Sequence, residues 1–276
     1  MRACACVYNI GLFLIAAAVS LAALGAKGQT NAPSPVIVCT TTHLSGLVET
    51  LAGDLFQAET IVPWGMCPGH FELKRGDIEK IWEAGLILGH GTEKFLSAFE
   101  GNKSYVPIAA VSVAGNWMIP TVQKRAAERV AAILAEKFPQ NAEIIHANLS
   151  AYQKRIAALE NELQPHLKRI KNIPVICSTM SAEYVAWMGL IVTAEFQRDN
   201  DLSLRNLQDV IQKARNAGAR IVVDNRQSSG KAGQTLARQL DLPLVMLSNF
   251  PEPDSGGHFS YEVTLKKNVL ALSNSR

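Results

Sequence analysis

The sequence NAEIIHANLSAYQKRIAALENELQPHLKRI, residues 141–170, decides the fold of this chain. Its apolar side chains recur at steps of 4, 3, 4, 3, 4, 4 and 3 residues, at Ile145, Leu149, Tyr152, Ile156, Leu159, Leu163, Leu167 and Ile170. This spacing is typical of one face of an α-helix. It predicts a straight helix about 40 Å long, with a kink or an end at Pro165. A coiled-coil dimer is the alternative, but the pattern is short for one and lies between two α/β segments.

On both sides of this segment, short apolar runs alternate with amphipathic ones. The predicted strands are 36–39, 60–62, 86–88 and 106–109 before it, and 175–177, 190–193, 221–223 and 244–247 after it. The first predicted helix begins at 40–42, and the others cover 77–83, 93–99, 204–216, 232–240 and 261–272. Such alternation indicates the α/β class with mostly parallel sheets. We therefore predict two (β/α) lobes, 33–138 and 173–276, joined by one long backbone helix at 139–172, with a ligand cleft between the lobes.

The amino-terminal segment has the pattern of an export signal. An apolar run from Ile10 to Leu24 is followed by small residues, which predicts a signal peptide over 1–28 cleaved after Ala26 or Gly28. The run is short for a spanning helix, which needs about 20 residues, and an uncleaved anchor is the alternative. Because Cys4 and Cys6 lie too early for lipid attachment, we expect a periplasmic protein without a lipid anchor.

Composition limits the remaining possibilities. A chain of 276 residues with 48% hydrophobic content is long and apolar enough for two modest domains. Without Arg2 and Lys27, 25 of its 27 basic residues remain against 24 acidic ones, which argues against nucleic acid as a partner. Export leaves Cys39, Cys67 and Cys177, and an odd number leaves at least one thiol unpaired. Whether Cys39 pairs with Cys67 or with Cys177 stays open.

The turn WGMCPGHFE, residues 64–72, carries the strongest chemical signal. Its thiol, Cys67, and imidazole, His70, lie three residues apart in a Gly/Pro-rich turn after a predicted strand. Both groups bind borderline-soft metal ions, and a rigid turn favours their sharing one ion. The alternative is a plain tight turn with Cys67 packed inward and His70 in solvent, because two donors do not complete a tetrahedral site.

Two further candidate ligands follow predicted strands. His90 and Asp224 stand at carboxyl ends of strands, the edge where ligands gather in open α/β sheets. The alternatives are a histidine that hydrogen-bonds neighbouring backbone, and an aspartate that caps a helix or pairs with Arg226. Three other histidines are predicted to lie on helix surfaces without a specific role: His43, His146 and His166. His258 lies in a loop and is predicted to be solvated, with chelation from that loop as the alternative.

An ordered set of motifs along the mature chain resembles the zinc/manganese solute-binding proteins of ABC importers. The set comprises Ile61-Val62-Pro63-Trp64-Gly65 before His70, Ala84-Gly85-Leu86-Ile87-Leu88 before Gly89-His90-Gly91, Trp117 with Pro120, Asn148 with Tyr152, Tyr184 with Gly189, and Tyr261 with Asn268. The resemblance implies two lobes joined by a long helix, a metal ion bound between them, and delivery to a membrane permease.

The chain departs from that family at most of its usual ligands, which are three His, or two His with a Glu, plus an Asp. His70 matches the first His. The other positions carry uncharged side chains: Asn116 before Trp117, Ser178 or Thr179 at the third ligand, and Ser248 or Asn249 at the final Asp. We expect these residues, with Trp64 and Trp117, to line the cleft. Cys177 and Met180 flank the third position, and we predict both as core residues.

These observations predict an extracytoplasmic solute-binding protein, a monomer that captures a transition-metal ion and delivers it to an ABC permease. The predicted ligands are Cys67, His70, His90 and Asp224, and the cargo is zinc or another divalent or thiophilic ion such as copper(I). The alternative is a metal chelate or small organic ligand held by the polar side chains and Trp64 and Trp117. The sequence contains no G-x-S-x-G, H-E-x-x-H, P-loop or Rossmann fingerprint, so we do not expect an enzyme.

Overall fold

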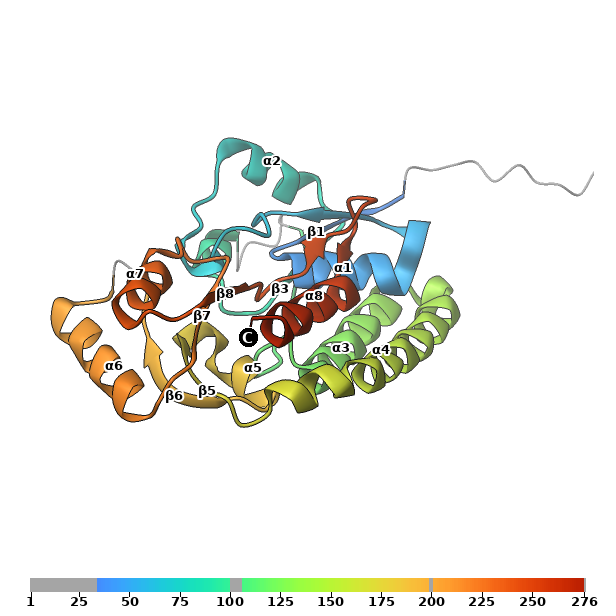
Figure 1. Cartoon of the computed structure of the whole chain (residues 1–276). Coiled ribbons are helices and arrows are strands. Elements are labelled where there is room, and N and C mark those ends of the chain that lie inside the picture. The colour runs from blue at the N-terminus through green and yellow to red at the C-terminus, as the bar shows by residue number, and fades with distance from the viewer. Residues whose placement is uncertain (1–33, 100–105, 199–200, 276) are drawn as a thin grey trace, which may run out of the picture. The chain divides into compact units, whose positions relative to one another are not determined.

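Two four-stranded parallel sheets form the framework of the protein (Figure 1). The first has the order β2-β1-β3-β4, with β1 at Val36–Cys39, β2 at Gln57–Thr60, β3 at Leu86–Gly89 and β4 at Ile108–Ala110. The second has the order β6-β5-β7-β8, with β5 at Pro174–Ser178, β6 at Ile191–Phe196, β7 at Ile221–Asn225 and β8 at Leu244–Leu247. The same topology therefore occurs twice, and the α/β class with two lobes of parallel strands is confirmed.

This computed structural model describes residues 34–99, 106–198 and 201–275. The predicted signal peptide, 1–28, lies outside them. Residues from Pro35 onward form one unit by their contacts, and the predicted limits of the lobes, 33–138, 139–172 and 173–276, stay predictions. In the described part of the chain, no helix combines the length and apolar character needed to cross a bilayer.

Helices flank both sheets. They are α1 (Thr42–Ala52), α2 (Arg75–Glu83), α3 (Pro120–Lys137), α4 (Ala142–Ile170), α5 (Ala182–Trp187), α6 (Leu204–Asn216), α7 (Lys231–Leu240) and α8 (Tyr261–Ser273). Short 3-10 helices lie at Gly53–Leu55, Pro68–His70, Lys94–Phe99, Pro139–Asn141 and Thr179–Ser181. A two-stranded antiparallel ribbon, β9 (Glu252–Pro253) and β10 (Phe259–Ser260), precedes α8.

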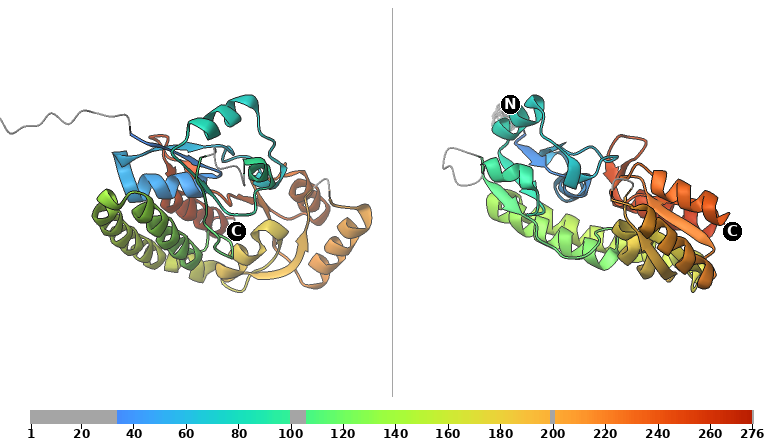
Figure 2. Two further views of the ribbon diagram at one scale, coloured as in Figure 1. Left: turned by 180° about the vertical axis from the view of Figure 1, so that it is seen from behind. Right: turned by 90° about the vertical axis from the view of Figure 1, so that its left-hand side faces the viewer.

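The long helix is α4, with 29 residues. It packs against α1 and α3 of the first lobe and against α8 beside the second sheet, and the right-hand view of Figure 2 shows it running along both lobes. The predicted stripe faces inward: Ile145, Tyr152, Ile156, Leu159, Leu163 and Ile170 are buried, and Leu149 and Leu167 are partly buried. Of the two alternatives predicted at Pro165, a kink or an end, the end is wrong, since the helix continues through Pro165 to Ile170. The packed stripe outweighs the one backbone hydrogen bond that proline removes.

The strand after α1 also differs from its prediction. The sequence places it at 60–62, whereas β2 ends at Thr60. Its parallel pairing nevertheless continues, because Ile61 N–H donates to Cys39 O at 2.9 Å and Val62 N–H to Thr40 O at 3.1 Å. Ile61 and Val62 are therefore held beside the end of β1, and the chain enters the Cys67 turn from a fixed point.

Hydrophobic cores hold the lobes together as well as folding each one. One face of each sheet packs in a hydrophobic cluster that belongs to that lobe alone, around Val38 and Ile87 in the first lobe and around Ile176 and Val222 in the second. The opposite faces contribute to one cluster shared by both lobes. Burial of apolar surface stabilises by about 25 cal/mol per Å², so separating the lobes would expose a large part of this shared core.

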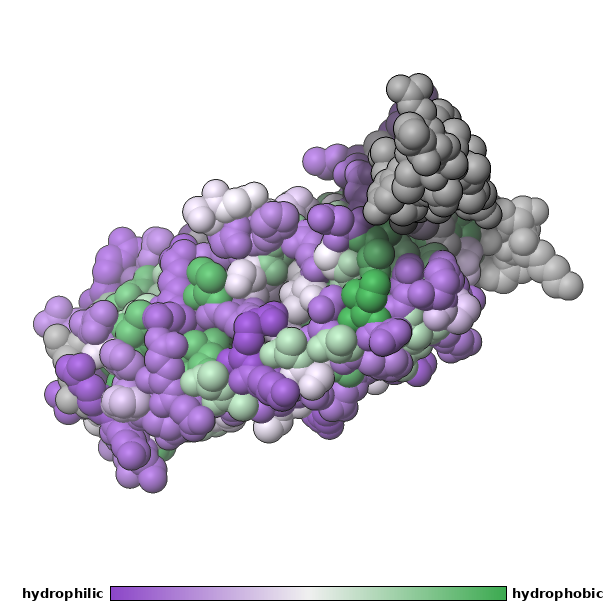
Figure 3. Space-filling view, turned by 90° about the vertical axis from the view of Figure 1, so that its right-hand side faces the viewer, coloured by the Kyte–Doolittle hydropathy of each residue, from purple (hydrophilic) through white to green (hydrophobic). Residues whose placement is uncertain are grey.

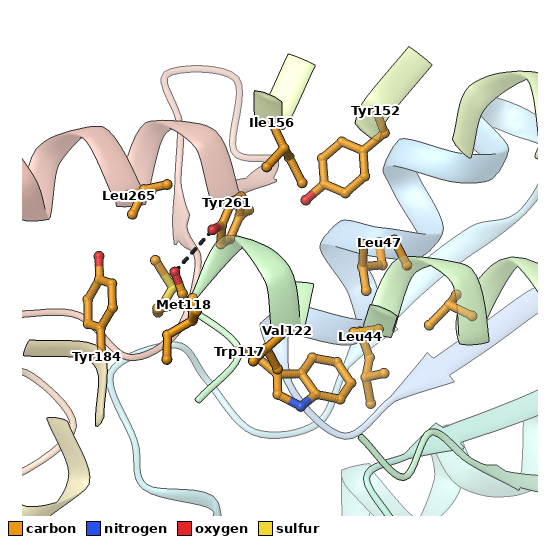
Figure 4. Packing of buried hydrophobic residues seen from close by; sticks show 14 of the residues in the cluster. Leu44, Leu47, Trp117, Met118, Val122, Tyr152, Ile156, Tyr184, Tyr261 and Leu265 are labelled. Carbon is orange, nitrogen blue, oxygen red and sulfur yellow. Dashed lines mark hydrogen bonds between the residues drawn. The ribbon is translucent and has the colours of Figure 1, made fainter. Parts of the chain in front are cut away.

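The shared core includes buried polar groups that fix its alignment (Figure 4). Tyr261 of α8 packs near Ile156 of α4 and donates from its hydroxyl to the Met118 carbonyl at 3.0 Å. Asn268, also on α8, accepts from Ser248 N–H at 3.0 Å and donates to Ser248 O at 2.8 Å, which holds the end of β8. On the face seen in Figure 3, most described residues are hydrophilic, with hydrophobic ones between them.

Candidate functional site

A cavity of about 590 Å³ lies where strand ends of the two lobes meet. Its lining is Thr41, His43, Cys67, Pro68, Gly69, His70, His90, Thr92, Glu93, Val113, Gly115, Asn116, Trp117, Met180, Arg198, Asn249 and Phe250. Thr41 follows β1, His90 follows β3, Arg198 follows β6 and Asn249 follows β8. In parallel α/β folds these carboxyl ends are the usual ligand-binding edge, so the backbone topology itself brings the lining together.

The Cys67–His70 turn forms one wall of the cavity. Pro68–His70 is a single 3-10 turn, closed by the His70 N–H, which donates to Cys67 O at 3.1 Å. Proline at the first helical position favours this turn. Cys67 is half-buried and His70 is exposed, and both side chains reach the cavity. The sulfur of Cys67 accepts a hydrogen bond from Arg198 Nη1 at 3.5 Å, which links the turn to the second lobe.

His90 lines the same cavity from the end of β3. Its Nε2 lies 2.8 Å from Thr41 Oγ1, and its ring centroid is 4.3 Å from that of Trp117 in an edge-on arrangement. Burial lowers the pKa of His90, and the nearby Glu93 carboxylate offsets part of this effect. A neutral imidazole oriented by a hydroxyl is the form that binds a metal ion.

Glu93 is a charged lining residue that the sequence did not single out. Its carboxylate accepts from Thr40 Oγ1 at 2.5 Å, His90 N–H at 2.7 Å and Thr92 N–H at 3.0 Å. Burial raises its pKa, but the hydrogen bonds from Thr40 and His90 outweigh that effect and leave the pKa below the usual value. Its position three residues after His90, in the same strand-end turn, was the available signal.

The prediction that His43 lies on a helix surface without a specific role is wrong. Only 3% of its surface is exposed, and it packs 5.6 Å from Trp117 and 5.2 Å from Phe250, between ring centroids. Its Nε2 lies 2.9 Å from the Asn249 carbonyl. Because a carbonyl only accepts, Nε2 carries the proton and Nδ1 holds the lone pair, and Nδ1 has no hydrogen-bond partner among the described residues. Burial, with repulsion from His90, lowers the pKa of His43 to about 3.

Three of the predicted cleft-lining residues, Asn116, Trp117 and Asn249, do line the cavity. The Asn249 side chain donates to Met180 O at 3.0 Å, and that of Asn116 donates to the same oxygen at 3.3 Å. Trp117 donates from Nε1 to Val113 O at 2.9 Å. Met180, predicted as core, is 54% exposed and lines the cavity. Asn116 and Asn249 therefore converge on the second lobe's Met180 carbonyl.

Asp224 is not part of the cavity lining. It is buried, and its Oδ2 accepts from Gly233 N–H at 3.1 Å while its Oδ1 accepts from Asn225 N–H at 2.7 Å. A Cβ at residue 233 would lie 2.6 Å from that Oδ2, so Gly233 is required for the close approach. The structure thus favours the capping role for Asp224, at the start of α7.

The remaining predicted lining residues also lie off the cavity wall. Ser178 accepts from Asn225 Nδ2 at 3.0 Å, and Thr179 donates to Phe196 O at 3.1 Å. Ser248 donates to Phe250 O at 2.7 Å, and the Trp64 carbonyl accepts from Gln227 Nε2 at 2.8 Å. Because these hydrogen bonds all go to other residues of the protein, the four residues support the strand ends and the contact between the lobes.

The cysteines are all free thiols in the described chain. Cys39 and Cys177 are buried strand residues, as the sequence indicates for Cys177. Burial raises the pKa of both thiols, that of Cys177 to about 12, so they stay neutral at physiological pH. Of the three, only Cys67 lines the cavity. His258 is exposed and lies 3.5 Å from Glu49, outside the cavity lining.

The cavity donors do not converge on one point. Within residues 34–99, 106–198 and 201–275, no three His, Cys, Asp or Glu side chains are grouped as a metal ion would require. Cys67, His70, His90 and Glu93 approach from two turns of the first lobe, and Arg198 of the second lobe places a positive charge beside Cys67. The arrangement can contribute sulfur and nitrogen donors to a ligand and pair with a negative group on it.

Comparison with known proteins identifies the family. The family model described as "Zinc-uptake complex component A periplasmic" matches residues 37–275. The chain belongs to this family. Its members are periplasmic metal-binding components of ABC importers, which confirms the resemblance seen in the sequence, and these homologues are transport proteins and not enzymes.

Individual relatives are distant. The "Uncharacterized protein RP014" of Rickettsia prowazekii is 27% identical over 216 residues, covering 72% of this chain and 70% of that protein. The "Iron-binding protein YfeA" of Yersinia pestis is 28% identical over 183 residues, 58% of each protein. A crystal structure of ZnuA superposes with a TM-score of 0.73 at 20% identity, covering 88% of this chain and 99% of that one. The last likeness concerns the fold alone.

Proposed function

We propose that this member of the family captures a zinc ion at Cys67, His70 and His90 and delivers it to an ABC permease. The observation that carries the proposal is that these three side chains, two of them in one turn, line a single cavity at the strand ends. Sulfur and imidazole donors favour zinc or another thiophilic ion over magnesium, calcium or manganese. The relative named as an iron-binding protein supports a transition-metal cargo without fixing which one.

Capture requires the donors to move together. Cys67 must lose its proton to bind the ion, so binding releases a proton and weakens as pH falls. Thr41 holds the His90 ring in place through its hydroxyl. The shared core and α4 limit movement of one lobe against the other, so we propose that the Cys67–His70 turn closes onto His90. In the cell we further propose a monomer, released into the periplasm by cleavage of its signal peptide and carrying no lipid anchor.

The test is elemental analysis of the exported protein. A C67S/H70A double variant should lose its zinc to near zero while its circular dichroism stays unchanged, because both residues lie in an exposed turn outside the core. His146→Ala, on the exposed side of α4, is the control and should keep its metal. Competitive titration with zinc, copper(I) and manganese gives the selectivity; binding of all three weaker than about 1 mM would refute the proposal.

A further inference from the structure

Arg198 is the one arginine or lysine in the lining of the main cavity, within the described residues. It follows β6, its side chain is 29% exposed, and its guanidinium lies 3.5 Å from Cys67 Sγ through Nη1 and 3.5 Å from Asp201 Oδ2 through Nη2. A positive charge beside the best metal donor repels a bare cation. It attracts a ligand that carries negative groups, which a guanidinium binds through paired hydrogen bonds.

A second cavity adjoins the first at Arg198 and His70, which line both. It measures about 240 Å³ and is otherwise lined by Asp201, Gln227, Ser228, Ser229 and Lys231. Lys231 and Arg198 outnumber the one carboxylate, and the amide and hydroxyl groups add hydrogen-bonding capacity. The second cavity is therefore a polar, net cationic extension of the metal-donor cavity.

The size of the main cavity is also unlike that of a site for a single bare ion. Zinc sits about 2.0–2.3 Å from its donors, so four protein ligands leave no free volume around it. The 590 Å³ measured here falls in the range of small-molecule pockets, about 300–1,000 Å³. Trp117, Phe250 and Val113 give it apolar walls. Because the described donors do not group in threes, other atoms must complete the coordination of any ion bound there.

We propose that the cargo is an anionic metal chelate: a transition-metal ion held by a small chelator bearing carboxylates. The inference rests on the proposed function and refines its substrate. Cys67, as thiolate, and His70 fill the coordination positions that the chelator leaves open, and the thiol proton goes to solvent. Arg198 pairs with a chelator carboxylate, and the rest of the chelator extends toward Ser228 and Lys231. Trp117 and Phe250 enclose its carbon frame.

The test compares two zinc complexes of opposite charge. Zinc–nitrilotriacetate is anionic, zinc–tris(2-aminoethyl)amine is cationic, and both chelators are tetradentate and leave coordination open to protein donors. Calorimetry gives the affinities, and native mass spectrometry shows whether the chelator stays bound with the metal. We expect a ternary complex of protein, zinc and nitrilotriacetate, bound at least about tenfold more tightly than the amine complex because of Arg198.

Three variants and one control separate the roles of the residues. Arg198→Gln should weaken zinc–nitrilotriacetate binding about tenfold or more relative to any change in its binding of free zinc, and Lys231→Gln should do so to a smaller extent. Arg198→Lys, which keeps the charge but loses the planar fork, should fall between Arg198→Gln and the wild type. Arg205→Gln, exposed on α6 and absent from both cavity linings, is the matched control.

The outcomes distinguish this inference from the proposed function. A protein that takes zinc out of nitrilotriacetate, or binds free zinc and rejects the complex, overturns the chelate and leaves metal capture intact. Equal affinity of the wild type and Arg198→Gln for zinc–nitrilotriacetate also overturns the inference. A protein that binds zinc in none of the three forms refutes both. If Arg198→Gln loses its circular dichroism signal, the inference is tested by Lys231→Gln and by comparing the affinities of the wild type for the two zinc complexes.

Discussion

His43 should make the metal-free protein lose stability as the pH falls from 7 to 5. Its pKa is about 3 in the native state against a usual value of 6.5. Between these values the unfolded chain binds a proton at His43 that the folded chain does not, so the free energy of unfolding falls as pH decreases. The loss grows by about 1.4 kcal/mol per pH unit below 6.5, or about 2 kcal/mol at pH 5.

The physical cause lies in the surroundings of the ring. Protonation would place a charge between the rings of Trp117 and Phe250, near His90, on a side chain that is almost entirely buried. In the described part of the chain, only Asn249 O offers the ring a hydrogen-bond partner, and it already accepts from Nε2. His90, whose pKa is also lowered by burial, adds a change of the same sign, while Glu49, whose pKa burial raises, adds one of opposite sign. Comparing the wild type with a variant that lacks His43 isolates the contribution of His43 to the pH dependence of stability.

The assay is urea unfolding of metal-free protein at pH 7 and pH 5, with a chelator present because bound metal would stabilise the folded state. For the wild type, the drop in unfolding free energy between the two values should exceed that of His43→Gln by about 2 kcal/mol. His146→Gln, exposed on α4, should keep the wild-type pH dependence. Equal drops in wild type and His43→Gln would show that the ring is protonated, or hydrated, in the native state, and would refute this reasoning.

Three further substitutions test the packing and the role of Asp224. Gly46→Ala should lower the unfolding free energy by about 1–3 kcal/mol, because its Cβ would lie 2.4 Å from the Phe259 carbonyl oxygen. Gly76→Ala is the control: its added Cβ would have no atom within 4 Å, so this variant should be neutral or stabilise α2 by up to about 1 kcal/mol. Equal effects of Gly46→Ala and Gly76→Ala in denaturant melts would contradict the close contact between residue 46 and Phe259 O. Asp224→Asn should cost about 1–3 kcal/mol of stability by weakening the contact to Gly233 N–H, with no change in zinc affinity by calorimetry; a lost zinc site with unchanged stability would restore Asp224 as a ligand.

The fold was predictable because it depends on local patterns. A period near 3.6 in residues 145–170 identified α4, and short apolar runs identified the strands, since each pattern reports the face that its own element buries. The proline at 165 does not end the helix, because its local cost is small beside the packing of a helix that contacts α1, α3 and α8. The contacts that overrule it come from distant parts of the chain, and local sequence does not report them.

The candidate site was only partly predictable, for the same reason. Cys67 and His70 were found because one turn holds both, so sequence spacing alone brings them together. His43 was missed because the chain around Phe250 covers the start of α1, with Thr42 Oγ1 donating to Pro251 O at 2.9 Å. Arg198 reaches Cys67 only across the lobes. A carboxylate at a strand end, such as Asp224, suits a ligand and a helix cap equally well, and the signal for the cap was Gly233 in the following helix.

The distribution of contacts also determines which part of the site adapts to cargo. The floor of the cavity is fixed: Trp117 is buried, His43 is bonded to Asn249 O, and the neighbouring Met118 carbonyl accepts from Tyr261. The Cys67–His70 turn belongs to no sheet and meets the second lobe through the Arg198 hydrogen bond to Cys67. Since a packed core resists deformation more than such a turn does, binding should reposition the turn and Arg198 and leave the floor in place. Selectivity among cargoes then depends on what the thiol, the imidazole and the guanidinium can bind together, which is why Arg198 matters as much as the metal donors.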